Sequence, residues 1–136
     1  MGRCESDATL LCDSYLPASV TTSATGRSTR LVYSFGIANQ WTFEDWAGSR
    51  GFEVHAFDPT IPRLPEGTHA GVAFARVGLG LETVPSKGPL KDFWHSGNAV
   101  AGLGALMAAR NHTRLDVLKI DVEGSEFDIL QSFDWR

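Results

Sequence analysis

Hydrophobic residues along the chain gather into short blocks that polar and glycine-rich stretches separate. A compact β-branched and aromatic run at residues 31–37 predicts one strand, and a second run at residues 52–59 predicts another. Between these runs, Thr42 is the expected N-cap of a helix that carries acids in its first turn and closes on Gly51. The order strand, helix, strand predicts a parallel βαβ unit.

The second half of the chain continues the same alternation. Residues 69–80 are predicted to form a third strand that runs into a glycine-rich turn, and residues 81–96 are predicted to form a loop. A small-residue helix is expected at residues 98–111, a fourth strand at residues 115–120, and a further helix with Ser125 as its cap. Strands that alternate with helices predict a doubly wound α/β sheet, whose ligands bind beyond the carboxyl ends of the strands.

Length and composition predict one globular core and exclude some classes of partner. The chain has 136 residues, which is the size of one domain. The Ser/Thr-rich residues 1–30 are interpreted as a flexible arm, followed by a partial domain over residues 31–136. A formal net charge of −4 disfavours nucleic acid as a partner. No stretch approaches the ~20 apolar residues that a transmembrane segment needs.

The cysteines and histidines show no metal-binding spacing. Cys4 and Cys12 lie in the arm, where they can pair with each other or stay free, and four histidines are scattered along the chain (His55, His69, His95 and His112). We therefore predict no metal site from the sequence. The first six letters, MGRCES, match the pattern for N-myristoylation at Gly2, but an arbitrary starting methionine explains them as well, so the compartment stays open.

Polar residues follow the predicted strands where a ligand would bind. Gly36 and Asn39 follow the first strand, Asp58 ends the second, and Asp121 and Glu123 follow the fourth. Because the carboxyl ends of parallel strands meet at one edge, these residues are expected to gather there. A carboxylate about twenty residues after the glycine suits the two hydroxyls of a ribose, so the pattern indicates a nucleoside-bearing cofactor.

The turn after the first strand argues against a dinucleotide. It lacks the G-x-G-x-x-G pattern, and the carboxylates of Glu44 and Asp45 would meet a pyrophosphate at close range. A dinucleotide-dependent oxidoreductase is therefore disfavoured. S-adenosylmethionine, which carries a positive sulfonium, suits an acidic edge better.

These residues carry a family resemblance. The strings LVYSFGIANQWTFEDW, GFEVHAFDP, ARVGLG and LDVLKIDVEGSEFDIL resemble the FkbM-like (methyltransferase-21) family of class I S-adenosylmethionine-dependent methyltransferases, and most of all its methyltransferase-like animal branch. The resemblance runs from about residue 31 to about residue 130 and implies a Rossmann-like sheet. It implies that the following residues bind the cofactor: Ser34, Gly36, Ile37 and Asn39 at the methionine end, Asp58 at the ribose, and Asp121, Glu123 and Gly124 near the transferred methyl group.

The resemblance implies methyl transfer to oxygen, with Asp121 as the candidate catalytic residue. The acceptor, a small molecule or a glycan, is not fixed by the sequence, and neither is the oligomeric state. Since the family fold continues beyond a fourth strand, the sheet is expected to be truncated after it. The alternative function is therefore a catalytically incompetent, truncated methyltransferase-like domain that acts as a cofactor-binding or interaction module.

Each acid also has a purely structural interpretation. Asp58, which precedes Pro59, can simply cap its own turn. Asp121 and Glu123 can be solvated loop acids, and Glu123 and Glu126 can serve the dipole of the helix that follows.

Overall fold

The computed structural model describes residues 4–7, 9–12, 21–22, 28–62, 64, 68–81 and 99–134. In chain order the elements are β1 (Cys4–Asp7), β2 (Thr9–Cys12), β3 (Thr21–Thr22), β4 (Ser28–Thr29), β5 (Leu31–Phe35), α1 (Thr42–Ser49), β6 (Glu53–Phe57), β7 (Val72–Ala75), β8 (Val77–Leu79), β9 (Ala99–Ala101), α2 (Leu103–Ala108), β10 (Val117–Ile120) and α3 (Glu126–Ser132). Gly2 and His95 lie outside the described residues.

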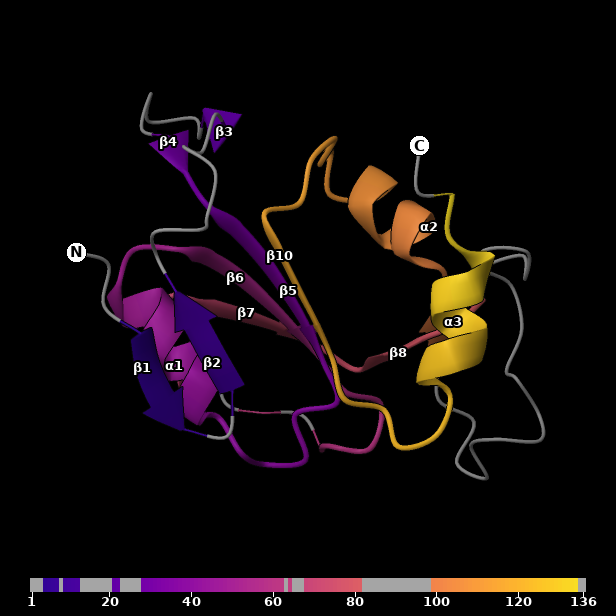
Figure 1. Ribbon diagram of the computed structural model, residues 1–136, viewed down its shortest axis with the longest axis horizontal. Coiled ribbons are helices and arrows are strands. Elements are labelled where there is room, and N and C mark those ends of the chain that lie inside the picture. Colours follow the sequence, from indigo (N-terminus) through magenta and orange to yellow (C-terminus); the bar gives the residue numbers. More distant parts are fainter. Residues whose placement is uncertain are drawn as a thin grey trace.

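The central sheet is parallel throughout, as predicted. Its strand order is β10-β5-β6-β7, and β5, the first of these strands in the chain, pairs with both β6 and β10. The helix α1 connects β5 to β6, which confirms the predicted βαβ unit. The chain therefore has an α/β fold of Rossmann-like type, with helices flanking a four-stranded parallel sheet (Figure 1).

Alternate residues of β5 pack on opposite faces of the sheet, as the period of a strand requires. Leu31, Tyr33 and Phe35 belong to a core cluster that also includes buried residues of α2 and α3. Val32 belongs to a second cluster, which contains Ala47 of α1. Figure 1 shows the same layers, with α1 on one side of the sheet and α2 and α3 on the other. Every residue of β5 is buried, so this strand forms the centre of the fold.

Two predicted boundaries were wrong. Residues 69–80 form β7 and β8 rather than one strand, and residues 99–101 form β9 rather than the start of a helix. The reason is that β8 pairs with β9 in a separate parallel sheet, which takes the chain out of the central sheet after Ala75. Tertiary pairing overrides the helix propensity of the alanine-rich stretch here.

The predicted helix caps also differ in detail. Thr42 is the first residue of α1 rather than its N-cap, and Trp41, which occupies the N-cap position, makes no side-chain capping bond. Ser125 does occupy the N-cap position of α3, yet it too makes no side-chain capping bond. Gly51, with φ of +80°, follows the end of α1 as predicted.

The N-terminal residues contribute two short antiparallel pairs, β1 with β2 and β3 with β4. Their register places Cys4 opposite Cys12. The proposed division of the chain at residue 30 stays a prediction. Within the described part of the chain, no helix has the length and apolar character required to span a membrane.

Candidate functional site

The candidate site lies where the strand order reverses. The chain passes from β5 to β6 on one side, whereas β10 returns to pair on the other side of β5. In a doubly wound sheet the ligand crevice lies beyond the carboxyl ends of the strands at such a point. Here backbone hydrogen bonds connect the ends of neighbouring strands. The Asp121 amide after β10 donates to the Phe35 carbonyl of β5 at 3.0 Å, and the Gly36 amide after β5 donates to the Phe57 carbonyl of β6 at 3.0 Å.

Gly36 allows the loop after β5 to touch the end of β10. Its φ is +77°, and a Cβ atom placed on it would lie 1.7 Å from the carbonyl oxygen of Asp121. Further along the loop, Ala38 and Asn39 also have positive φ, at 48° and 62°. Backbone in the left-handed region is costly for residues other than glycine and is characteristic of functional loops. Glycine therefore permits the tight backbone at residue 36, whereas at Ala38 and Asn39 the surrounding contacts must hold it.

Asp58 supplies most of those contacts. One carboxylate oxygen, Oδ2, accepts hydrogen bonds from the amides of Ile37 and Ala38, both at 3.0 Å. The other oxygen, Oδ1, accepts from the Thr60 amide at 2.8 Å and the Thr60 hydroxyl at 2.6 Å. The residue is only 4% exposed. Asp58 therefore caps its own turn and also holds the loop that the sequence assigned to the cofactor.

Asp121 and Glu123 are exposed at the same edge of the sheet. Glu123 has φ of 49° and Gly124 φ of 100°, so the turn into α3 is also tight. The carboxylate of Glu126 holds this turn by accepting from the amides of Val122 at 3.1 Å and Gly124 at 2.8 Å. Hydrogen bonds from backbone amides, including its own, lower the pKa of Glu126. Glu126 is therefore a loop-positioning acid that the sequence suggested only as a partner of the helix dipole.

Ser34 faces α1 rather than the edge of the sheet. It is fully buried, and its hydroxyl donates to Oε1 of Glu44 at 2.5 Å. Lys119 of β10 donates to the same oxygen at 3.3 Å. Glu44 is itself fully buried, and its Oε2 finds no hydrogen-bond partner among the described residues. Through Glu44, the Ser34–Glu44–Lys119 network joins α1 to β5 and β10, and it was not predicted from the sequence.

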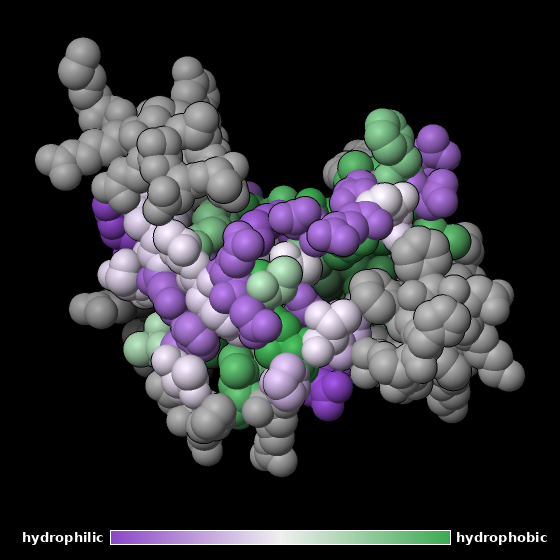
Figure 2. All heavy atoms as spheres, turned by 90° about the horizontal axis from the view of Figure 1, so that it is seen from below, coloured by the Kyte–Doolittle hydropathy of each residue, from purple (hydrophilic) through white to green (hydrophobic). Residues whose placement is uncertain are grey.

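The edge of the sheet is polar and mixed in charge. The loops after β5 and β10 lie low in Figure 1, and the view from below in Figure 2 shows hydrophilic residues in a band, with hydrophobic atoms between them. Arg76, which follows β7, is exposed and donates to the Pro59 carbonyl at 3.5 Å. Among the described residues, the edge therefore offers the exposed carboxylates of Asp121 and Glu123 and the cation of Arg76 to a ligand that carries charges of both signs.

We expect Asp58→Asn to lower stability in a pH-dependent way. Although burial raises the pKa of Asp58, hydrogen bonds from Ala38, Thr60 and Ile37 outweigh it and hold the pKa below the ordinary 3.8. Such a carboxylate stabilises the fold above its unfolded-state pKa, and this contribution is lost as the pH falls through the folded-state pKa. At pH 7 the free energy of unfolding of the variant, measured in urea, should be about 1–3 kcal/mol lower than that of wild type. The difference from wild type should shrink below about pH 4; a difference that does not change with pH would contradict the assignment.

Comparison with known proteins gives one match. The family model described as the methyltransferase FkbM domain matches residues 100–136, which include α2, β10 and α3. No curated protein and no solved structure matches the chain. The match supports a methyltransferase-type function and contains Asp121 and Glu123. The closeness to an animal branch stays a prediction.

Proposed function

We propose that this chain binds S-adenosylmethionine at the edge where β5 and β10 meet and belongs to a methyltransferase that acts on oxygen. One observation carries the proposal: a glycine-dependent loop after β5 is packed against the acidic turn after β10, at the point where the strand order reverses. The FkbM domain match to residues 100–136 supports the same reading.

Each candidate residue has a role in this proposal. Gly36, Ile37 and Asn39 shape the pocket for the methionine end, since the loop backbone is exposed where Asn39 lies. Ser34 fixes β5 against α1 through its bond to Glu44, so its proposed contribution to the site is to position the strand that the loop follows. Asp58 is the proposed partner of the ribose hydroxyls. Its two oxygens already accept four hydrogen bonds, so a ribose hydroxyl would have to replace one of these donors, the Thr60 hydroxyl.

Near the methyl group, the exposed carboxylates of Asp121 and Glu123 suit the positive sulfonium. Asp121 is the candidate catalytic residue, because it lies at the carboxyl end of β10 beside Gly36. The chemistry required of the protein is alignment of an acceptor oxygen with the methyl group for in-line displacement, which is mainly positioning.

Calorimetric titration with S-adenosylhomocysteine tests the proposal. Wild type is expected to bind with a micromolar dissociation constant, and Asp58→Asn to bind about 10–100-fold more weakly, because a charge-assisted hydrogen bond is lost. Asp116→Asn is the matched control: like Asp58, Asp116 accepts from a backbone amide, that of Leu31 at 2.8 Å, but at the opposite end of β5 from the candidate site. This control should keep the wild-type affinity.

The outcomes separate the candidate functions. No binding by a wild-type chain that circular dichroism shows to be folded would overturn cofactor binding. Binding without transfer of a labelled methyl group to hydroxyl-bearing small molecules or glycans would favour the alternative, a cofactor-binding module without catalysis.

A further inference from the structure

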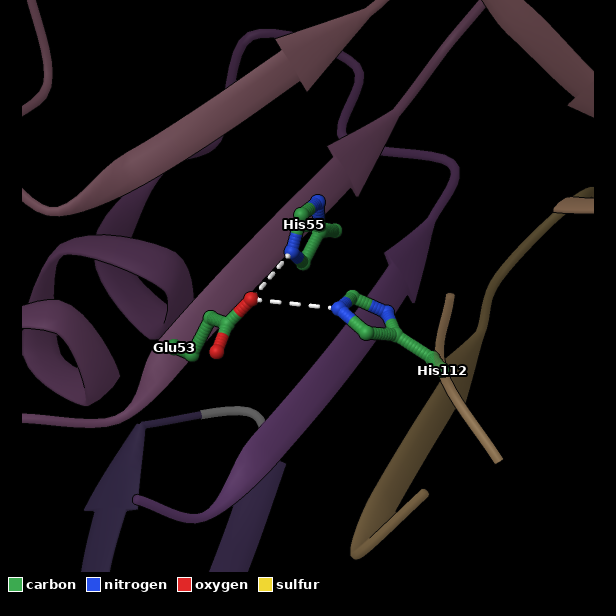
Figure 3. Close-up of side chains that lie close together, drawn as sticks. All are labelled: Glu53, His55 and His112. Carbon is green, nitrogen blue, oxygen red and sulfur yellow. Dashed lines mark hydrogen bonds and ion pairs between the residues drawn. The ribbon is translucent and has the colours of Figure 1, made fainter. Parts of the chain in front are cut away.

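Three potential metal ligands meet on one face of the sheet. Glu53 and His55 lie two residues apart on β6, and His112 comes from the loop that follows α2. Oε1 of Glu53 is 3.0 Å from Nε2 of His55 and 3.2 Å from Nε2 of His112. Figure 3 shows both imidazole rings directed at this one oxygen. The three ligand atoms lie within 4.8 Å of one another.

These distances suit a transition-metal ion. Metal-to-ligand bonds of about 2.0–2.2 Å in zinc sites place neighbouring ligand atoms roughly 3.0–3.4 Å apart. The two separations at Glu53 are already of that size, so binding requires loss of the bridging protons and only small side-chain movements. Two imidazoles and one carboxylate form a donor set that zinc uses when solvent completes the coordination. Glu53 is 41% exposed, which leaves a route for that solvent ligand.

The surroundings hold the histidines in place. The second ring nitrogen of His112, Nδ1, lies 2.7 Å from the hydroxyl of Tyr33, which is fully buried. Such a contact fixes the orientation of a metal-bound imidazole, because the phenol oxygen can accept a hydrogen bond from Nδ1–H. The ring of His55 packs against Tyr33 and Phe57, at centroid distances of 5.3 and 6.5 Å. Both imidazoles are mostly buried, at 14% and 15% exposure.

One nearby charge opposes a cation. The guanidinium of Arg110 lies 4.9 Å from the centre of the Phe57 ring, and it donates to the Leu106 carbonyl at 3.1 Å. Burial is the largest influence on the pKa of both Tyr33 and His55, and the positive charge of Arg110 acts on both groups to lower the pKa. Arg110 therefore weakens the affinity for a divalent cation, and the expected affinity is micromolar rather than the much tighter binding of an all-cysteine site.

We propose that Glu53, His55 and His112 bind one divalent transition-metal ion of the zinc type. The site is separate from the candidate cofactor site, because β6 begins at Glu53 and reaches the cofactor edge only after Phe57. The ion would join β6 to the loop after α2, two segments that are distant in the sequence. Because the ion would bind the folded chain alone, it would stabilise the fold by mass action.

The first experiment is titration of the metal-free full chain with Zn²⁺, followed by Co²⁺ as a spectroscopic probe. We expect one equivalent of zinc to bind, and the thermal midpoint to rise by roughly 10 °C at a zinc concentration 100 times the dissociation constant. Cobalt should give the visible absorption of a nitrogen- and oxygen-liganded site, without the ultraviolet band of thiolate ligation. The Cys4→Ser/Cys12→Ser variant should bind as wild type does.

Point variants identify the ligands. His112→Gln and His55→Gln should each lower zinc affinity by at least about 100-fold, and Tyr33→Phe by about tenfold, since outer contacts typically contribute 10–100-fold. His69→Gln is the matched control, because His69 also contacts a carboxylate, Asp45 at 2.8 Å, outside the cluster. Circular dichroism of each variant shows whether it is folded.

Two results would overturn the proposal. The first is a folded wild-type chain that binds no stoichiometric zinc. The second is zinc affinity that stays at the wild-type value in folded His55→Gln and His112→Gln.

Discussion

Replacing Gly36 with alanine is expected to lower the free energy of unfolding by about 3–5 kcal/mol. Two physical effects combine in this variant. The left-handed backbone at φ of +77° costs alanine about 1–2 kcal/mol relative to glycine. The new Cβ would also lie 1.7 Å from the Asp121 carbonyl oxygen, so the loop and the end of β10 must separate. Because that contact defines the candidate cofactor site, S-adenosylhomocysteine binding should be lost as well.

The variant Gly51→Ala separates the cost of the left-handed backbone from the cost of steric overlap between the new Cβ and Asp121. Gly51 has nearly the same backbone angle, φ of +80°, but a Cβ added there has no heavy atom within 4 Å among the described residues. This variant should lose only the ~1–2 kcal/mol of backbone strain and keep ligand binding. Urea unfolding of both variants measures the difference. Equal losses at the two positions would show that the packing of Gly36 against Asp121 is unimportant.

The second large effect is expected for Lys119→Met, which should destabilise the chain by about 3–5 kcal/mol. Methionine keeps most of the aliphatic length of lysine but removes the charge that lies 3.3 Å from Oε1 of Glu44. Glu44 is fully buried and would keep the Ser34 hydroxyl as its remaining described partner. A buried carboxylate that loses its counterion loses more than the ion pair itself contributed. Chemical denaturation measures the loss.

Two further variants test this reasoning. The double variant Glu44→Gln/Lys119→Met removes both charges, so it should regain much of the lost stability. Arg114→Met is a matched control, because Arg114 also binds a buried carboxylate, that of Asp116 at 2.7 Å. Asp116 retains the Leu31 amide, and Arg114 is 34% exposed against 16% for Lys119, so water can replace the Arg114 cation more easily. The loss should therefore be smaller than for Lys119→Met. A double variant as unstable as Lys119→Met would contradict the account.

The central part of the fold could be predicted because local patterns and tertiary structure agree there. The apolar runs at β5, β6 and β10 and the start and stop signals of α1 identify a parallel sheet without knowledge of contacts. Gly36, Asp58 and Asp121 could be assigned to one edge for the same reason, since strand ends in a parallel sheet converge. The small β8–β9 sheet could not be predicted, because it depends on pairing between segments that lie apart in the sequence.

Side-chain direction explains what else was missed. Alternation along β5 directs Ser34 to the α1 face, and the period of a strand could have indicated this. Glu53 and His55 are also on one face by the same rule, so two of the three candidate metal ligands were recoverable. The position of His112 follows only from the pairing of β10 beside β5, which no local spacing reveals.

The place of β10 has a consequence for the order of folding. β5 can pair with β6 soon after β5 is synthesised, but its other partner, β10, ends only at Ile120. The Leu31 amide likewise waits for Asp116, a partner 85 residues away. Long-range parallel pairing of this kind is slow, and strand edges left open during synthesis invite association. During translation, one edge of β5 therefore stays unpaired until residues 117–120 have been synthesised, and in that interval this edge is open to association with other chains.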